Sequence, residues 1–65
     1  MSTQFTHAEL VNKVNDNTNV AVQWGYSLLN ISKISDNDAN PRIYELTESQ
    51  QFEDGHVREI YIQVN

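Results

Sequence analysis

Without a single cysteine, a chain of 65 residues has to stabilise its fold by side-chain packing or by association. A domain this short buries only about 60% of the surface that its unfolded chain exposes, and small natural domains commonly add disulfides, a metal or a second subunit. Disulfides and thiolate zinc sites are excluded, and two histidines, His7 and His56, would need several carboxylate partners to hold a metal. We therefore expect one small domain, residues 1–65, without metal or cofactor. A homodimer or a hetero-complex is the first expectation, and a monomer packed around Trp24 is the alternative.

The N-terminal segment carries the signature of a helix start. Thr6 followed by Glu9 forms a capping box, in which each side chain binds a free backbone N–H group at the helix start. Phe5 and Leu10 have the spacing of a hydrophobic staple. Poor helix formers follow at residues 15–17. The pattern predicts a helix from about His7 to Asp16 that docks through the apolar residues Leu10, Val11 and Val14.

The central segment, residues 20–34, fits two patterns. With a period of two, one face collects five large residues, which is typical of a half-buried strand: Val20, Val22, Trp24, Tyr26 and Leu28. A helical stripe collects four residues, and Gly25 would weaken a helix interior by roughly 1 kcal/mol. We predict a strand with Trp24 and Tyr26 in the core, and a bulge or bend near residues 28–30, where the alternation shifts.

Two more strands are expected, at 42–46 and 57–64. In the second, the side chains of Ile60, Ile62 and Val64 share one face, and those of Glu59, Tyr61 and Gln63 share the other. Together with the helix, these elements predict an α+β domain with one short N-terminal helix packed on a three- or four-stranded, mainly antiparallel sheet.

The connection before the last strand leaves its register open. Asp54-Gly55 is a preferred centre of a hairpin turn. A two-residue loop there pairs Thr47 with Ile62, whereas a shift by one residue pairs Leu46 with Val64. Both registers set polar residues beside the isoleucines. A helical turn over residues 49–52 is the alternative.

The charge balance excludes some functions. Nine carboxylates oppose four lysines and arginines, giving a formal net charge of −5, and this argues against direct nucleic-acid binding, which needs cations to neutralise phosphates. No apolar run approaches the roughly 18 residues of a membrane span, and the N-terminus lacks the pattern of a signal peptide. We expect a soluble, cytoplasmic protein with neither nucleic acid nor membrane as its direct partner.

Seven of the nine carboxylates fall within residues 36–59, where only two arginines interrupt them. The spacing Asp36-x-Asp38-x-Asn40 resembles the start of a calcium loop, but Pro41 and Thr47 stand where that loop needs Gly and Glu. Both histidines are expected on the surface. Tyrosines exposed among polar residues are typical of protein interfaces, and Tyr61 fits that description. The predicted partner-binding residues are Asp36, Asp38, Tyr44, Glu45, Glu48, Glu53, Asp54, Glu59 and Tyr61.

These features predict a non-enzymatic interaction module, an inhibitor or accessory protein, that binds a basic partner protein. Such partners include nucleic-acid-binding proteins, whose phosphate site an acidic face imitates. The alternative is a self-assembling structural subunit whose acidity serves only solubility. No catalytic residue is predicted, because neither a Ser-His-Asp set nor a phosphate-binding loop can be assembled from the sequence.

Overall fold

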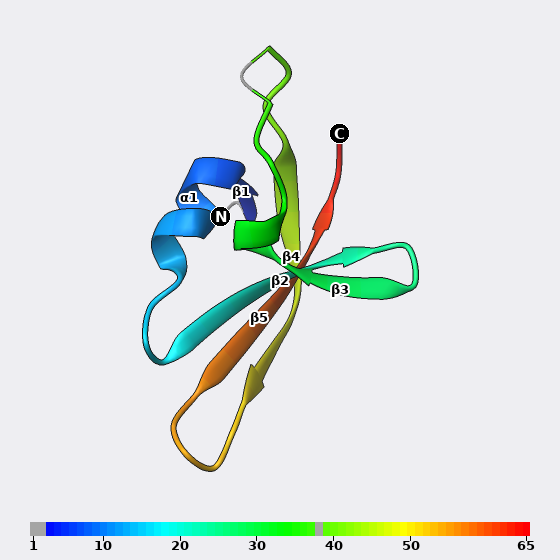
Figure 1. Cartoon of the computed structure of the whole chain (residues 1–65). Coiled ribbons are helices and arrows are strands. Elements are labelled where there is room, and N and C mark those ends of the chain that lie inside the picture. The colour runs from blue at the N-terminus through cyan, green and yellow to red at the C-terminus, as the bar shows by residue number, and fades with distance from the viewer. Residues whose placement is uncertain (1–2, 38) are drawn as a thin grey trace.

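The computed structural model describes residues 3–37 and 39–65, which form five strands, an α-helix and one turn of 3-10 helix (Figure 1). In chain order the elements are β1 (Gln4–Thr6), α1 (His7–Lys13), β2 (Thr18–Trp24), β3 (Ser27–Asn30), the 3-10 turn η1 (Ile31–Lys33), β4 (Ile43–Gln51) and β5 (Val57–Gln63). The strands form one sheet in the order β1-β4-β5-β2-β3. Neighbouring strands are antiparallel except the central pair, β2 and β5, which is parallel.

The α+β class is confirmed, but the expected three- or four-stranded sheet has five strands and is mixed. Two local events account for the extra strands. The residues that precede the helix cap extend along β4 as β1, and the central segment divides into β2 and β3. Helix α1 and the turn η1 lie on the same side of the sheet, because Leu10 and Ile31 share one core cluster (Figure 1).

Helix α1 begins where the capping box predicts. The Thr6 hydroxyl accepts from the backbone N–H of Glu9, and the Glu9 carboxylate accepts from that of Thr6. The helix ends at Lys13, three residues earlier than predicted. The Asn15 side chain accepts from the backbone N–H groups of residues 17 and 18 and so stabilises a turn instead. Val11, predicted on the docked face, is 44% exposed.

The single strand predicted over residues 20–28 is instead a hairpin. Trp24 pairs with Ser27 across a two-residue turn, Gly25-Tyr26. Gly25 has a φ of +62°, and glycine at the first central position is what a type II′ turn requires. The prediction that Trp24 and Tyr26 fill the core was wrong: Tyr26 is fully exposed at the turn, and Trp24 is 43% exposed.

The β4–β5 hairpin has neither predicted register. Its loop is longer: the Phe52 N–H donates to the His56 carbonyl at 2.8 Å, and the Gly55 N–H donates to the Phe52 carbonyl at 3.0 Å. Gly55 has a φ of +92°, so the loop is a three-residue turn closed by a glycine bulge. A second irregularity at Thr47 separates the Leu46–Tyr61 pair from the Glu48–Ile60 pair. Residues 49–51 belong to β4, so the helical-turn alternative was wrong as well.

The core lies between the sheet and the two helical elements. Its buried cluster consists of Leu10, Val20, Val22, Ile31, Ile34, Tyr44 and Tyr61. Phe5, Val14, Leu29 and Leu46 pack against this cluster from its edges. Because α1 contributes Leu10 to it, the helix covers the face of the sheet that carries Val22 and Tyr61.

Candidate functional site

The structure places the predicted partner-binding residues in separate parts of the molecule. Asp36 lies in the loop that follows η1, Glu45 and Glu48 lie on β4, and Glu53 and Asp54 lie in the β4–β5 turn. Asp38 lies outside the described residues. The remaining members of the predicted set, Tyr44, Glu59 and Tyr61, are on the face that α1 covers.

The expectation that Tyr44 and Tyr61 are exposed was wrong, because both side chains are fully buried. Each hydroxyl has a hydrogen-bond partner, which offsets the free-energy cost of removing the hydroxyl from water. The Tyr44 hydroxyl lies 3.1 Å from Nδ1 of His7, itself a buried residue of α1. The prediction that His7 lies on the surface was therefore wrong, because its side chain is buried. Neither tyrosine ring is available as an anchor for a partner.

Glu59 belongs to a second fastening point between α1 and the sheet. The Lys13 ammonium lies 3.1 Å from the Glu59 carboxylate and donates to the Tyr61 hydroxyl at 3.0 Å. That hydroxyl donates to Glu59 at 3.1 Å, and the ammonium also lies 4.5 Å from the centre of the Phe5 ring. Burial raises the pKa of Tyr61. The pKa of Lys13 is raised too: burial opposes this, but the hydrogen bonds to Tyr61 and Glu59 outweigh it.

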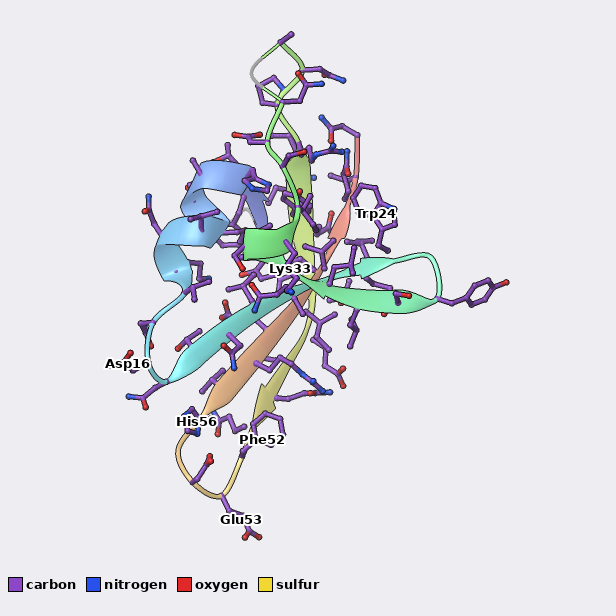
Figure 2. All side chains as sticks on the ribbon, in the orientation of Figure 1. Asp16, Trp24, Lys33, Phe52, Glu53 and His56 are labelled. Atoms are coloured by element: carbon purple, nitrogen blue, oxygen red, sulfur yellow. The ribbon has the colours of Figure 1, made fainter. Side chains whose placement is uncertain are left out.

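The carboxylates at the β4–β5 turn are exposed and lie at one end of the sheet. Figure 2 shows Glu53 and His56 there, at the same end as Asp16. Asp54 holds His56 with a contact of 2.7 Å between Oδ2 and Nδ1. Its pKa is lowered, chiefly by the hydrogen bond that it accepts from the His56 backbone. These side chains shape the turn and leave Glu53 projecting into solvent.

The face of the sheet opposite α1, called here the open face, holds two of the predicted residues, Glu45 and Glu48. Successive side chains of a strand alternate between faces, and directly paired residues share one. Because Tyr61 faces α1, Ile60 and Ile62 belong to the open face. Glu48 is paired with Ile60. Glu45 is paired with Ile62. The central open-face residues are Ala21, Gln23, Leu28, Glu45, Glu48, Ile60 and Ile62.

Apolar surface is accessible on the open face. Ile62 is 39% exposed and Leu28 is 43% exposed, whereas Ile60 between its neighbours is buried. Both described helical elements lie on the other side of the sheet, so neither of them covers these two side chains. Leu28 and Ile62, with Gln23 of β2 between their strands, therefore form an accessible, partly apolar strip flanked by carboxylates.

The carboxylates of the open face keep their charge available. Neither Glu45 nor Glu48 forms an ion pair with any described residue. Arg58 lies on the same face and is linked to Glu48 through Gln50, whose side-chain amide donates to the Glu48 carboxylate at 3.1 Å. It donates twice to Oε1 of Gln50, at 2.9 and 2.6 Å, and its guanidinium lies 5.8 Å from the centre of the Phe52 ring. The open face thus presents two carboxylates without an ion pair to a described residue beside its apolar strip.

Leu28 and Ile62 are the site residues that the sequence reasoning missed. The signal was present for Ile62, because the alternation along the last strand put the isoleucines and Tyr61 on opposite faces. We assigned the more hydrophobic face of the last strand to the core, and this was wrong. Hydrophobicity alone does not include the hydrogen-bond partners that allow Tyr61 to be buried.

Among the described residues, no group of three or more metal-ligating side chains is clustered, and no helix is long and apolar enough to cross a membrane. No protein-family model, curated protein or solved structure matches this chain.

Proposed function

We propose that the protein is a non-enzymatic interaction module, an inhibitor or accessory protein, that binds a basic partner protein through the open face of its sheet. The observation that carries the proposal is the pairing of accessible apolar side chains with carboxylates that form no ion pair with a described residue. Ile62 and Leu28 are exposed there, and Glu45 is the direct cross-strand neighbour of Ile62.

An apolar centre with a charged rim is the usual composition of a protein interface. Exposed apolar groups supply affinity when a partner excludes water from them, and rim charges set the association rate and the choice of partner. A partner suited to this face has an apolar ridge flanked by lysine or arginine. The formal net charge of −5 favours such a partner at long range as well.

The histidines support a binding role over a catalytic one. His7 is buried against Tyr44. His56 is held by Asp54 in an exposed turn, and it lines neither of the two hollows described below. A general base needs a substrate position within hydrogen-bond reach, and neither imidazole lines the two hollows beside Trp24.

Affinity capture with matched variants tests the proposal. Glu45→Gln with Glu48→Gln neutralises the open face, while Asp16→Asn with Glu53→Gln removes the same charge from the far end of the sheet. A protein captured by wild type and by the far-end variant, but lost with the open-face variant, supports the proposal. Equal capture by both double variants, or capture of nothing above a blank resin, refutes it.

Surface-plasmon kinetics on the captured protein separate the two parts of the interface. Neutralising Glu45 and Glu48 should slow association about tenfold at low salt and leave dissociation nearly unchanged. Ile62→Ala should instead speed dissociation and cost about 1–2 kcal/mol of affinity. Val11→Ala is the matched apolar control, because Val11 is similarly exposed at 44% but lies on the helix.

A second copy of the chain is the alternative occupant of the open face. Arg58 and Glu48 lie in neighbouring rows of this face, so a two-fold axis through it would bring opposite charges of two copies together. Equilibrium sedimentation distinguishes the two cases. A homodimer that Ile62→Lys converts to monomer assigns the face to self-assembly.

A further inference from the structure

Trp24 is the largest apolar side chain of the protein that the core does not use. It is the last residue of β2 and lies on the same face as Val22, but it is not part of the buried core cluster. Its indole is 43% exposed and forms a wall of two hollows. In a chain with so few apolar residues, an accessible tryptophan beside a hollow points to binding.

The larger hollow, about 410 Å³, lies where the carboxyl ends of β2 and β5 separate. These two central strands run parallel, then β2 turns into β3 while the chain after β5 leaves toward the loop around residue 42 (Figure 1). Diverging carboxyl ends of parallel strands leave a crevice that commonly holds ligands. The volume is within the range of small-molecule sites, about 300–1,000 Å³.

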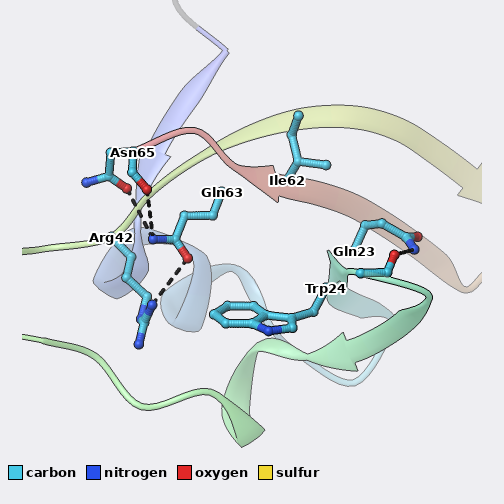
Figure 3. Close-up of a pocket in the computed structure, with 7 residues that line it drawn as sticks. Gln23, Trp24, Arg42, Ile62, Gln63 and Asn65 are labelled. Carbon is cyan, nitrogen blue, oxygen red and sulfur yellow. Dashed lines mark hydrogen bonds between the residues drawn. The ribbon is translucent and has the colours of Figure 1, made fainter.

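Figure 3 shows the walls of this hollow: the Trp24 ring, Arg42, the amide side chains of Gln23, Gln63 and Asn65, and Ile62, which also belongs to the open face. The ring offers a flat apolar surface. The amides of Gln63 and Asn65 are engaged with Arg42, with each other and with the backbone, and these bonds fix the shape of the rim. Gln23 donates to the Gly25 carbonyl at 2.8 Å, which fixes the orientation of its amide.

Positive charge gathers beside the indole. The Arg42 guanidinium lies 5.4 Å from the centre of the Trp24 ring, with Nε donating to the Ser35 carbonyl and Nη1 to Gln63. Its Nη2 group makes no hydrogen bond with the described part of the chain. Lys33 lines the smaller hollow, about 240 Å³, on the other side of Trp24. Neither cation forms an ion pair with a described carboxylate.

We propose that the Trp24 hollow binds a small, planar, anionic molecule: an aromatic ring that stacks on the indole and carries a carboxylate or phosphate beside Arg42. Stacking on tryptophan and charge-assisted bonds from a guanidinium are each strong enough to matter at this size. Arg42 supplies the direct contact, and Lys33 adds attraction for the same negative group. In a protein with an excess of carboxylates, these two cations without an ion pair to a described carboxylate favour an anion beside Trp24.

Titrations followed by heteronuclear NMR test the site, because Trp24 is the single tryptophan and its indole N–H signal is unique. Adenosine monophosphate and benzoate are the ring-bearing anions, adenosine and benzamide are their neutral analogues, and phosphate and acetate lack the ring. Saturable shifts at the indole and at the Gly25 and Gln63 amides are expected with at least one ring-bearing anion. The neutral analogue should bind about tenfold more weakly. Comparison with phosphate and acetate shows how much the ring contributes to binding.

Variants separate this site from general charge effects. Lys33→Gln should weaken binding roughly two- to fivefold, while Arg58→Gln removes the same charge at a distant position and should change nothing. Trp24→Leu should abolish the shifts at Gly25, with the methyl signals of Val20 and Val22 reporting an intact core. Glu45→Gln with Glu48→Gln should leave ligand binding intact, so failure of the partner proposal and failure of this one are distinguishable.

Three outcomes overturn the inference. One is the absence of saturable shifts with both ring-bearing anions. Another is equal affinity for the neutral analogues. The third is equal weakening by Lys33→Gln and Arg58→Gln, which would reduce the effect to overall charge.

Discussion

Replacing Tyr61 by Phe removes one oxygen atom from the point where α1 is fastened to the sheet. That hydroxyl accepts a hydrogen bond from the Lys13 ammonium at 3.0 Å and donates one to the Glu59 carboxylate at 3.1 Å. The ring itself is fully buried in the core, so Phe keeps the packing and deletes only the polar contacts.

The expected loss is about 1–2 kcal/mol. A hydrogen bond to a charged group contributes about 1.5–3 kcal/mol, and two are lost. The direct Lys13–Glu59 contact at 3.1 Å survives, and the Lys13 side chain is 34% exposed, so its ammonium regains water. Both effects reduce the expected loss of unfolding free energy to about the value of a single such hydrogen bond. Against a total stability of about 5–15 kcal/mol for a small domain, the change is easily measured.

Urea unfolding at neutral pH measures the effect, with two other tyrosines as controls. Tyr26→Phe removes a fully exposed hydroxyl and should leave the midpoint unchanged. Tyr44→Phe removes the buried bond to His7 and should cost about 1 kcal/mol. If Tyr61→Phe unfolds at the same urea concentration as Tyr26→Phe, the hydroxyl does not fasten the helix and the reasoning fails.

The same contacts predict how stability responds to alkali. Burial raises the pKa of Tyr61, so the unfolded chain loses that proton first, and stability falls as the pH rises above about 10. The pKa of Lys13 is also raised, so its contribution is complete below its unfolded pKa and is lost as the pH rises through the folded one. The free energy of unfolding of Tyr61→Phe should therefore fall less steeply than that of wild type above a pH of about 10.

Three further expectations follow from the fold. Leu10→Ala should lower the free energy of unfolding by about 2–5 kcal/mol, because this fully buried side chain docks α1, and an unchanged thermal midpoint would contradict the docking. Thr6→Ala should lower it by about 1 kcal/mol, because Thr6 caps the helix. Gly25→Ala should cost about 1–2 kcal/mol in urea unfolding through its φ of +62° alone, since an added Cβ meets nothing within 4 Å; equal stability would exclude the strained turn. Hydrogen bonds from Thr6 lower the pKa of Glu9, so that contribution is present above about pH 4.3 and lost as the pH falls, and Glu9→Gln should flatten the acid limb of the thermal midpoint.

Sequence reasoning succeeded where the determinants are local. The capping box of Thr6 and Glu9 lies within four residues, and it located the start of α1. The alternation along residues 57–63 identified β5. The Gly25 turn was equally local, but its glycine was interpreted only as a weakness of a helix and not as a type II′ signal.

The rest depended on contacts between distant residues. The register of the β4–β5 hairpin is shifted by the irregularity at Thr47, whose hydroxyl donates to the Ile60 carbonyl at 3.0 Å. The buried face of β5 is decided by Lys13, 48 residues away from Tyr61 in the chain. Glu45 and Glu48 were among the predicted binding residues, but the face that they share with Ile62 could not be predicted without that register.

The parallel pairing at the centre of the sheet sets the order in which the chain can fold during synthesis. The β2–β3 and β4–β5 hairpins each close over short loops, whereas Thr18 has to meet Val57, about 39 residues later in the chain. Such long loop closures slow folding. A ribosome-bound chain that has not yet exposed β5 has its apolar β2 residues unpaired on that side, so the centre of the sheet closes only after the last strand has emerged.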